Sequence, residues 1–276
     1  MNSAEFYKNK VVLITGASMG IGKELALQVL QNGGKVTITG RNEARLIAVQ
    51  DEFQEYSEKL LIHKGNVANY ENVVELIEKI ILHFGRLDVL INNAGMSTDF
   101  GELEIITDKV VDEIIDTNVK GALFPSMAAI PKLKETKGSI IFISSVAAFQ
   151  GIPAYSLYSL SKMALTALVQ SLRIENKKAG VFVGIAYIGF TENETEKRTL
   201  SHDGKLKKVP VRNKLITRPR SLTAKIILNQ IANRRPRVYH SFFGKLIFIL
   251  SKFIPIVTNI MYEQIYNNKK NTRDSE

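Results

Sequence analysis

The first two-thirds of the chain alternate short apolar runs with longer stretches in which apolar residues recur at helical spacing. Runs of this length that are apolar throughout are typical of strands buried on both faces. The pattern therefore predicts an α/β fold, in which a doubly wound parallel sheet is covered by helices on both sides. The predicted strands occupy residues 10–15, 35–39, 59–63, 86–92, 138–144 and 181–187, and the clearest helices 21–30, 73–82 and 158–178.

Length and composition indicate a single domain with an extension. The 276 residues are 45% hydrophobic and 23% charged, as in an ordinary globular protein. No linker, internal repeat or low-complexity run interrupts the chain. We expect a domain over residues 1–240, in which polar residues 190–220 form a mobile lid over the substrate and 222–233 form a helix. Residues 241–276 are expected to form a basic, apolar helical extension.

A glycine-rich segment, TGASMGIG at 15–22, lies between the first predicted strand and the first predicted helix. Gly16 allows a tight turn, while Gly20 and Gly22 let the backbone and the helix approach a pyrophosphate at the helix N-terminus. The same glycines could form a purely structural turn. The agreement of strand, turn and helix favours a dinucleotide cradle.

Five ordered motifs resemble the short-chain dehydrogenase/reductase family. They are the Gly-x-x-x-Gly-x-Gly spacing at 16–22, NNAG at 92–95, TNVKG at 117–121, SS at 144–145, and Tyr158 with Lys162 four residues later. Tyr158 follows Ser145 by thirteen residues, as in that family. The resemblance covers roughly residues 1–190. It implies a Rossmann fold, oxidoreductase activity with a nicotinamide cofactor, and assembly as a homodimer or homotetramer.

The resemblance also implies which residues contact the cofactor. They are Gly16, Ser18, Met19, Gly20, Ile21, Gly22, Arg41, Asn66, Val67, Asn93, Ala94, Gly95, Tyr158, Lys162, Gly189 and Thr191. Two positions depart from the family's pattern, because Asn66 stands where many members have Asp and Ile188 replaces Pro before Gly189. Asn still donates and accepts hydrogen bonds. The loop after Gly189 is expected to follow a somewhat different path.

The end of the second predicted strand indicates which nicotinamide cofactor is preferred. NAD enzymes usually place an acid there to bind the ribose 2′-hydroxyl, whereas an arginine accommodates the 2′-phosphate of NADP. Gly40 takes the acid's position and Arg41 follows it. Arg41 could also be an exposed residue without a role. Because a guanidinium binds phosphate bidentately, the pair favours NADP(H).

The stretch YSLYSLSK at 155–162 contains two tyrosines, one of which is the candidate acid/base. Tyr158 has Lys162 four residues later on the same helical face, whereas Tyr155 has Ser159 there. A lysine cation lowers the pKa of a phenol that ordinarily titrates near pH ~10. The resemblance implies that Tyr158 is the acid/base and that Lys162 tunes its pKa and binds the nicotinamide ribose.

Two further residues complete the implied catalytic set. Ser145 would hydrogen-bond the carbonyl or alcohol oxygen, and Asn118 would hold a water that relays protons from Lys162 to solvent. Ser144 is expected on the other face of its strand, since side chains alternate. Each residue alone is common at such positions. Together they favour an enzyme over a non-catalytic NADP(H)-binding sensor or scaffold that docks on a membrane or partner.

The positive charge is concentrated in the tail. Residues 197–276 contain 18 Lys and Arg against 4 Asp and Glu, whereas residues 1–196 contain 19 against 23. The apolar segment 241–262 includes Lys245, Lys252 and Pro255, so it is unlike an uninterrupted bilayer-crossing helix. We expect two short amphipathic helices there. Peripheral membrane contact and packing against the protein itself or a second copy both stay open.

Composition also narrows the partners. The chain has no cysteine and its four histidines lack metal-ligand spacing, so no metal site is predicted. The basic residues accompany apolar ones and not a base-stacking surface, which argues against nucleic acid.

Since the N-terminus lacks a secretory signal, we expect a cytoplasmic protein, which would meet the inner face of a membrane if the tail binds lipid. Its small-molecule substrate would then be a lipophilic carbonyl or alcohol, such as a steroid-like, keto-sphingoid or acyl compound.

Overall fold

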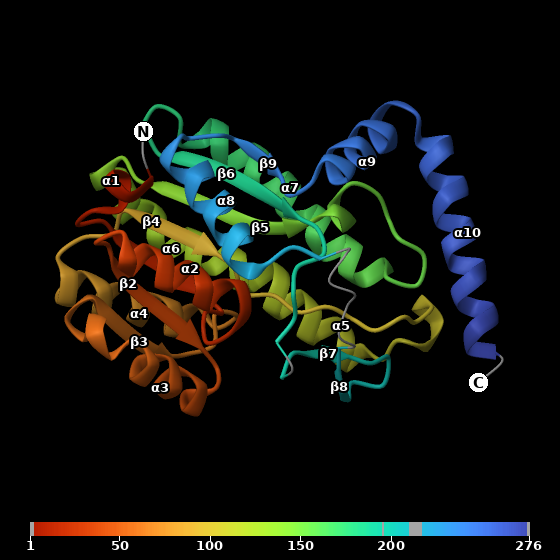
Figure 1. The fold of residues 1–276 in the computed structure, drawn as a ribbon, viewed down its shortest axis with the longest axis horizontal. Helices are drawn as coiled ribbons and strands as arrows, with labels where there is room; N and C mark the ends of the chain where they lie inside the picture. Colours follow the sequence, from red (N-terminus) through yellow and green to blue (C-terminus); the bar gives the residue numbers. More distant parts are fainter. Residues whose placement is uncertain (1–2, 195, 210–216, 275–276) are drawn as a thin grey trace.

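The computed structural model describes residues 3–194, 196–209 and 217–274. Within them, seven strands form one parallel sheet in the order β3-β2-β1-β4-β5-β6-β9 (Figure 1). The order reverses between β1 and β4, and ligands of open α/β sheets bind at the carboxyl ends of the strands beside such a reversal. The strands of this sheet are β1 (Val11–Thr15), β2 (Lys35–Gly40), β3 (Leu60–Lys64), β4 (Val89–Asn92), β5 (Ser139–Ser145), β6 (Phe182–Ile188) and β9 (Arg237–Tyr239).

Helices cover both faces of the sheet, so the predicted doubly wound fold is confirmed. Alternate residues of β1 enter two separate cores. Val12 and Ile14 pack with the helices α2 and α8, whereas Val11 and Leu13 pack with α4, α6 and α7. The helices are α1 (Ser3–Tyr7), α2 (Gly20–Gln31), α3 (Glu43–Glu52), α4 (Tyr70–Phe84), α5 (Asp108–Ile115), α6 (Gly121–Thr136), α7 (Ser156–Glu175), α8 (Arg220–Ala232), α9 (Phe242–Phe253) and α10 (Pro255–Asp274). Shorter helical turns are η1 (Gln54–Lys59), η2 (Leu103–Ile105), η3 (Asp116–Lys120) and η4 (Val146–Ala148).

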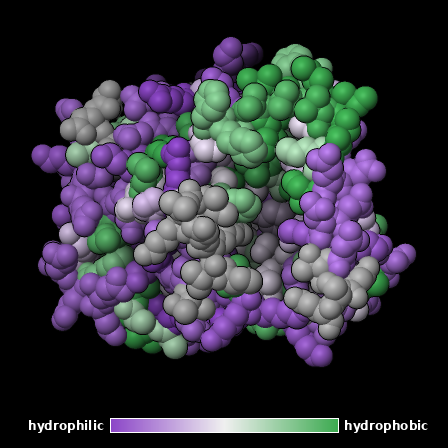
Figure 2. Space-filling view, turned by 45° about the vertical axis from the view of Figure 1, so that its right-hand side comes forward, coloured by the Kyte–Doolittle hydropathy of each residue, from purple (hydrophilic) through white to green (hydrophobic). Residues whose placement is uncertain are grey.

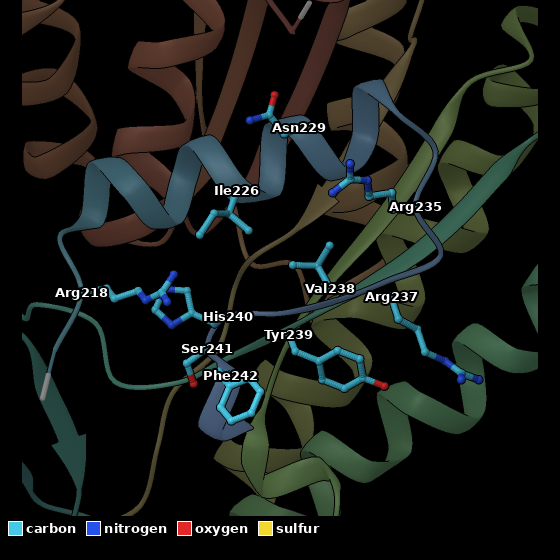
Figure 3. A pocket seen from close by; sticks show the side chains of 10 residues that line it. All are labelled: Arg218, Ile226, Asn229, Arg235, Arg237, Val238, Tyr239, His240, Ser241 and Phe242. Carbon is cyan, nitrogen blue, oxygen red and sulfur yellow. The ribbon is translucent and has the colours of Figure 1, made fainter. Parts of the chain in front are cut away.

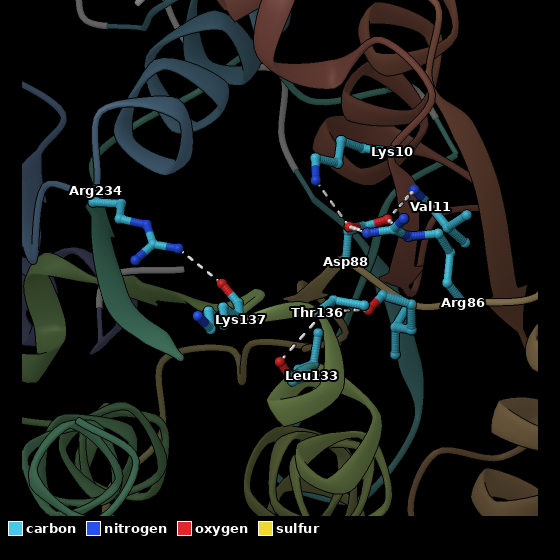
Figure 4. Close-up of polar contacts among 9 residues, drawn as sticks. Lys10, Val11, Arg86, Asp88, Leu133, Thr136, Lys137 and Arg234 are labelled. Carbon is cyan, nitrogen blue, oxygen red and sulfur yellow. Dashed lines mark hydrogen bonds and ion pairs between the residues drawn. The ribbon is translucent and has the colours of Figure 1, made fainter. Parts of the chain in front are cut away.

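All six predicted strands are present, but β4 begins at Val89 and not at residue 86. The preceding residues form a polar network around Asp88, which is 2% exposed. Its carboxylate accepts hydrogen bonds from Val11 N at 3.0 Å and from the side chains of Lys10 and Arg86 at 3.0 and 2.7 Å (Figure 4). The network joins the amino ends of β1 and β4, which lie side by side in the sheet.

The edge strand β9 was not predicted. It has only three residues, Arg237–Tyr239, which pair in parallel with β6. The sequence around it is basic and contains Pro236, so it lacks the apolar run that marks the other strands. Pairing with β6 decides its conformation, and local propensity does not.

The predicted lid contains regular structure. Strands β7 (Arg198–Leu200) and β8 (Leu206–Lys208) form an antiparallel pair, which corrects the expectation of a mobile loop throughout 190–220. Leu200 is 4% exposed because it packs with Val110, Ile114 and Leu157. The backbone of Leu200 also exchanges hydrogen bonds with Ser97 and Asp99, so both its side chain and its backbone hold the hairpin against the domain. Residues 195 and 210–216 of the predicted lid lie outside the described residues.

The extension consists of the two helices α9 and α10, with the break at Pro255 as expected. One side of the pair packs on the domain. Phe248 of α9 contacts Phe149 and Tyr239 with ring centroids 5.2 and 5.0 Å apart, and Thr258 and Tyr262 of α10 are buried.

Across the described residues, neither helix alone is long and apolar enough to cross a membrane. Taken together, α9 and 255–271 meet that test of length and composition, but they are bent by 117°.

Candidate active site

Helix α7 carries Tyr158 and Lys162 in its first two turns, beside the carboxyl end of β5. Lys162 is 6% exposed, and its Nζ donates a hydrogen bond to the Ile143 carbonyl of β5 at 3.3 Å. The same Nζ lies 5.9 Å from the centroid of the Tyr158 ring. Tyr158 itself is partly exposed. The structure therefore places a buried ammonium close to the ring of a partly exposed tyrosine.

Burial, with a smaller contribution from the positive charge of Lys197, lowers the pKa of Lys162 to about 8. Such a lysine is mostly protonated at neutral pH, yet it releases its proton more readily than an exposed lysine does. A fold that buries a lysine without a carboxylate partner loses stability by doing so. Strongly perturbed groups of this kind gather at functional sites.

Asn118 lies in η3, a π-helical turn between α5 and α6, and it is fully buried. Its side-chain oxygen accepts a hydrogen bond from Met96 N at 2.8 Å, and its nitrogen donates to Met96 O and Ser161 Oγ, each at 2.9 Å. A Cβ on Gly95 would lie 3.2 Å from Asn118 Oδ1 and 3.1 Å from Lys162 Nζ. Asn118 and Lys162 thus both border Gly95, and π-helical turns are frequent at functional sites.

The two serines at the end of β5 have different surroundings. Ser144 is 3% exposed and its hydroxyl donates to the Lys162 carbonyl at 3.2 Å. Ser145 is partly exposed and its Oγ accepts a hydrogen bond from Ala147 N at 3.2 Å, at the start of η4. Ser144 therefore supports α7, while Ser145 is the more exposed of the two serines.

Tyr155, the other tyrosine of the motif, faces the extension and not Lys162. Its hydroxyl accepts a hydrogen bond from Lys269 Nζ of α10 at 3.3 Å. Its ring also meets Phe100 edge-on, with centroids 6.0 Å apart. Each tyrosine thus lies near a different lysine. Lys162, next to Tyr158, is buried, whereas Lys269, next to Tyr155, is exposed.

The glycine-rich segment forms a turn between β1 and α2 that is braced by the segment after β4. Gly16 and Gly20 both have φ of +62°, a conformation that favours glycine. A Cβ on Gly22 would lie 2.5 Å from Asn93 Nδ2 and 2.8 Å from Ala17 Cα, so no side chain fits there. Asn93 Nδ2 donates to the Gly16 carbonyl at 2.9 Å, and Ala94 N to Thr15 Oγ1 at 3.0 Å. These contacts give Asn93 and Ala94 a role in shaping the turn.

The turn binds an anion in this structure. Gly20 N donates a hydrogen bond to the carboxylate of Glu194 at 2.8 Å, across 174 residues of sequence, and Glu194 also forms an ion pair with Arg220. Just before it, Asn193 has a buried side-chain amide for which no partner lies among the described residues. A cradle occupied by a carboxylate, beside an unsatisfied amide, fits a dinucleotide with phosphate and carboxamide groups. Sequence patterns indicated neither Glu194 nor Arg220.

The segment after β2 places two arginines near the cradle. A Cβ on Gly40 would lie 3.3 Å from Ser18 Oγ, so Ser18 is next to the end of β2. Arg41 forms an ion pair with Glu113 of α5, and both side chains are exposed. Arg45 lies in the first turn of α3, with its guanidinium 3.4 Å from Met19 Sδ. No sequence pattern indicated Arg45, because Arg41 lies before α3 and the helical repeat does not relate the two residues.

The remaining predicted cofactor residues line the loops that follow β3 and β6. Asn66 Oδ1 accepts a hydrogen bond from Ala68 N at 3.0 Å, and Val67 lies against Gly121. After β6, Gly189 is near His240, and Thr191 Oγ1 is 3.5 Å from Thr223 Oγ1. The last predicted contact, Ile21, lies in the first turn of α2 and packs against the core. All these loops meet at the carboxyl edge of the sheet.

A cavity of about 430 Å³ lies elsewhere, between α8 and the segment that contains β9 (Figure 3). Arg218, Arg235 and Arg237 line it together with Phe242 at the start of α9. None of the predicted catalytic residues lines it. Within the described ranges, no three His, Asp or Glu side chains group closely enough to hold a metal ion.

The family described as short chain dehydrogenase matches residues 10–204, and the chain belongs to this family of oxidoreductases. The chain is 37% identical over 193 residues to 11-beta-hydroxysteroid dehydrogenase-like 4A of Arabidopsis thaliana, a match that covers 69% of this chain and 64% of that protein. It is 32% identical over 260 residues to 11-beta-hydroxysteroid dehydrogenase-like 2 of the same plant, covering 93% and 82%. The first match thus spans less than two thirds of the relative's length.

Solved structures show the same fold. A short-chain dehydrogenase/reductase from Burkholderia phymatum in complex with NAD superposes with a TM-score of 0.78 at 20% identity, covering 91% of this chain and 96% of that one. ElxO with NADP bound superposes with a TM-score of 0.73 at 27% identity, covering 86% and 99%. The seven-stranded order is therefore that of the family's known structures.

Proposed function

We propose that this chain is an NADP(H)-dependent oxidoreductase that interconverts a carbonyl group and a secondary alcohol. The observation that carries the proposal is the buried Lys162 next to the partly exposed Tyr158. Family membership supports the reaction class, and the anion-binding turn at Gly20 supports a dinucleotide. When bound, the nicotinamide cofactor would supply or accept the hydride.

Each residue of the site has a defined task in this proposal. Tyr158 donates a proton to the carbonyl oxygen in reduction and removes it in oxidation, and the Lys162 ammonium favours its phenolate form. Ser145 donates a hydrogen bond that holds the same oxygen. Asn118 is fixed by three hydrogen bonds, and a second lone pair on its oxygen can hold a water that passes protons to Lys162.

Tyr158→Phe is expected to lower turnover of a ketone panel with NADPH about a hundredfold or more, because it removes the acid/base. Tyr155→Phe is the matched control, since this tyrosine lies in the same motif but faces α10. NADPH affinity should stay within a factor of about three in both variants. Wild-type binding of NADPH without turnover of any ketone or alcohol would favour the alternative, a non-catalytic sensor or scaffold. Equal loss in both variants would contradict the assignment of Tyr158.

The proposed preference for NADP(H) rests on the end of β2. Gly40 leaves no carboxylate there to repel a 2′-phosphate, and Arg41 and Arg45 supply two guanidinium groups. Two relatives at 27% identity, ElxO and an alcohol dehydrogenase from Thermococcus sibiricus, were solved with NADP and 5-hydroxy-NADP. Arg41 pairs with Glu113, so the 2′-phosphate would have to take over that ion pair.

Calorimetry with NADPH and NADH tests this preference. We expect wild type to bind NADPH more tightly by about tenfold or more, and Arg41→Asp to reduce or reverse that ratio. Lys79→Asp is the control, because Lys79 of α4 is similarly exposed and similarly paired with a glutamate. An unchanged NADPH/NADH ratio in Arg41→Asp would contradict the role of Arg41.

We also propose that the outer side of α9 and α10 contacts an anionic membrane surface and that the substrate is lipophilic. Figure 2 shows an apolar patch on this part of the molecule. It is formed by exposed residues that include Phe242, Phe243, Leu246, Ile249, Phe253, Ile254, Ile256, Val257 and Ile260. Residues 204–262 contain thirteen Lys and Arg and no Asp or Glu. Lys205, Lys207 and Arg220 of this segment pair with acidic residues outside it, but the segment keeps a large positive excess. An apolar patch on a segment of this charge fits anionic lipid headgroups, such as those of an inner membrane face.

Co-sedimentation with vesicles tests the membrane contact. Deleting the extension would uncover Phe149 and Tyr239, so point changes are preferable. We expect Phe253→Ser with Ile256→Ser to lower binding to anionic vesicles about tenfold or more, and to lower the weaker binding to zwitterionic vesicles as well, because the apolar contribution does not depend on headgroup charge. Leu82→Ser on α4 is the control, since Leu82 is 90% exposed elsewhere. If the double variant instead dissociates an oligomer without changing vesicle binding, the patch is a contact between copies.

A further inference from the structure

The carboxylate on the phosphate cradle comes from the chain itself. Glu194 lies in the segment after β6, Gly20 at the start of α2 and Arg220 at the start of α8. Glu194 accepts a hydrogen bond from Gly20 N at 2.8 Å and pairs with the Arg220 guanidinium. The side chains of Arg220 and Glu194 are 34% and 24% exposed. Three distant segments therefore meet through one partly buried carboxylate.

Helix α2 explains why an anion binds there. The N–H groups of a first helical turn lack partners within the helix, and the helix dipole adds a partial positive charge. Met19, the residue before α2, provides no side-chain cap. Glu194 therefore satisfies a donor that would otherwise need another anion. A Cβ on Gly20 would meet no atom of the described residues within 4 Å, so the turn is open on that side of Gly20.

We propose that Glu194 is a placeholder for a cofactor phosphate, and that Arg220 binds this phosphate once the carboxylate has been displaced. The inference rests on the proposed dinucleotide site. One N–H and one guanidinium cannot serve two anions at the same place, and a carboxylate beside a phosphate repels it. The pyrophosphate must therefore displace Glu194 from both partners. Arg220, released from its ion pair, can then bind the phosphate bidentately.

The neighbouring backbone allows this exchange without unfolding the segment. Glu192 N donates to the Arg218 carbonyl at 3.0 Å, and Thr191 forms a β-bridge with Arg218. These contacts hold the base of the segment next to α8, so Arg220 stays near the cradle. Glu194 lies beyond them, and its carboxylate can swing away by side-chain rotation. The affinity for the cofactor then includes the free energy lost when the internal ion pair breaks.

The test measures Kd for NADPH by calorimetry in the full chain. Glu194→Gln keeps the shape but removes the competing charge, and it should tighten NADPH binding by about tenfold, the effect expected of one anion at a helix N-terminus. Arg220→Gln should weaken binding by about tenfold or more, and Arg220→Lys should recover part of the loss. Inorganic pyrophosphate can be used as a competitor of NADPH. Its affinities for wild type and for these variants should follow the same order as those of NADPH.

Matched controls come from the same two segments. Glu192→Gln changes an acid two residues away, and Lys225→Gln changes an exposed cation on α8. Neither should shift the Kd by more than about twofold. Circular dichroism melting of each variant checks that it folds.

The outcomes separate this inference from the proposed function. Wild type that binds neither NADPH nor NADH would overturn both. Wild type that binds NADPH, with unchanged affinity in Glu194→Gln and Arg220→Gln, would overturn only the placeholder. Weaker binding in Glu194→Gln would make Glu194 a direct ligand of the cofactor, which also contradicts the proposal.

Discussion

The parallel sheet and the α9–α10 extension are both rich in apolar residues, yet they use them differently. Every residue of β1 and β4 is buried, because helices cover the sheet on both faces. In the extension, Ile247, Thr258 and Tyr262 are buried, while Phe253 and Ile256 are 70% and 65% exposed. Apolar composition alone is therefore a poor guide to burial. What decides burial is whether another layer covers the second face.

The two regions also differ in how they use charge. At the amino ends of β1 and β4, the buried Asp88 receives hydrogen bonds from a backbone amide and two cationic side chains. On the extension, Lys270 pairs with Glu102 at 2.9 Å where solvent reaches both groups. The first arrangement holds two strands together, whereas the second attaches a peripheral helix. Three pairs of substitutions would break or sharpen this contrast.

The largest difference is expected between two phenylalanines. Phe142→Ala in β5 should lower the free energy of unfolding by about 4 kcal/mol, because Phe142 is fully buried and its removal leaves a cavity. Phe253→Ala in α9 should change it by less than about 0.5 kcal/mol, because Phe253 is 70% exposed. Urea unfolding followed by circular dichroism measures both. A large effect of Phe253→Ala would mean that another surface covers α9 in solution.

The next effect compares the two carboxylates. Asp88→Ala should lower the free energy of unfolding by about 3 kcal/mol, since it leaves Val11 N without its partner and two cations without theirs. Glu102→Ala should cost about 1 kcal/mol or less, as exposed ion pairs do. The same urea series applies. Comparable losses in the two variants would show that α10 docks far more firmly than its exposure indicates.

The smallest effect concerns Lys162 and has the opposite sign. Lys162→Met should abolish turnover but raise the free energy of unfolding at pH 7 by about 2 kcal/mol, because it removes a buried charge. Lys252→Met on the extension should leave the stability nearly unchanged, since α9 exposes that lysine. Destabilisation by Lys162→Met would mean that the ammonium supports the fold.

The pH dependence of Lys162 follows from its pKa, which burial lowers from 10.5 to about 8. Below pH 8 the lysine is charged in both states, and the penalty for burying the charge is fully present. Between about pH 8 and 10.5 the unfolded chain binds more protons, so this group makes the stability rise with pH. Wild type should show that rise relative to Lys162→Met in unfolding experiments at pH 7.5 to 10. Parallel profiles would contradict the lowered pKa.

Local patterns were enough to predict much of the fold. The six apolar runs gave six strands, because a strand buried on both faces needs an apolar run and tolerates little else. The glycines of the cradle were recognisable because positive φ and close backbone contacts exclude most side chains. The pairing of Tyr158 with Lys162 follows from the helical repeat. These signals are all contained within a few neighbouring residues.

Other features depend on partners that are far away in the sequence. Strand β9 exists because β6 offers an open edge, and the β7–β8 hairpin is held by Leu200 in a small distant core. Glu194 contacts Gly20, 174 residues away in the sequence, and Arg220, 26 residues away. No sequence motif predicts either contact. The sequence by itself determined the layered sheet, the cradle and the tyrosine–lysine pair, because each follows from local periodicity or backbone sterics. Only the tertiary structure decided which carboxylate binds the cradle and which side of the extension stays exposed, because these depend on how distant segments pack together.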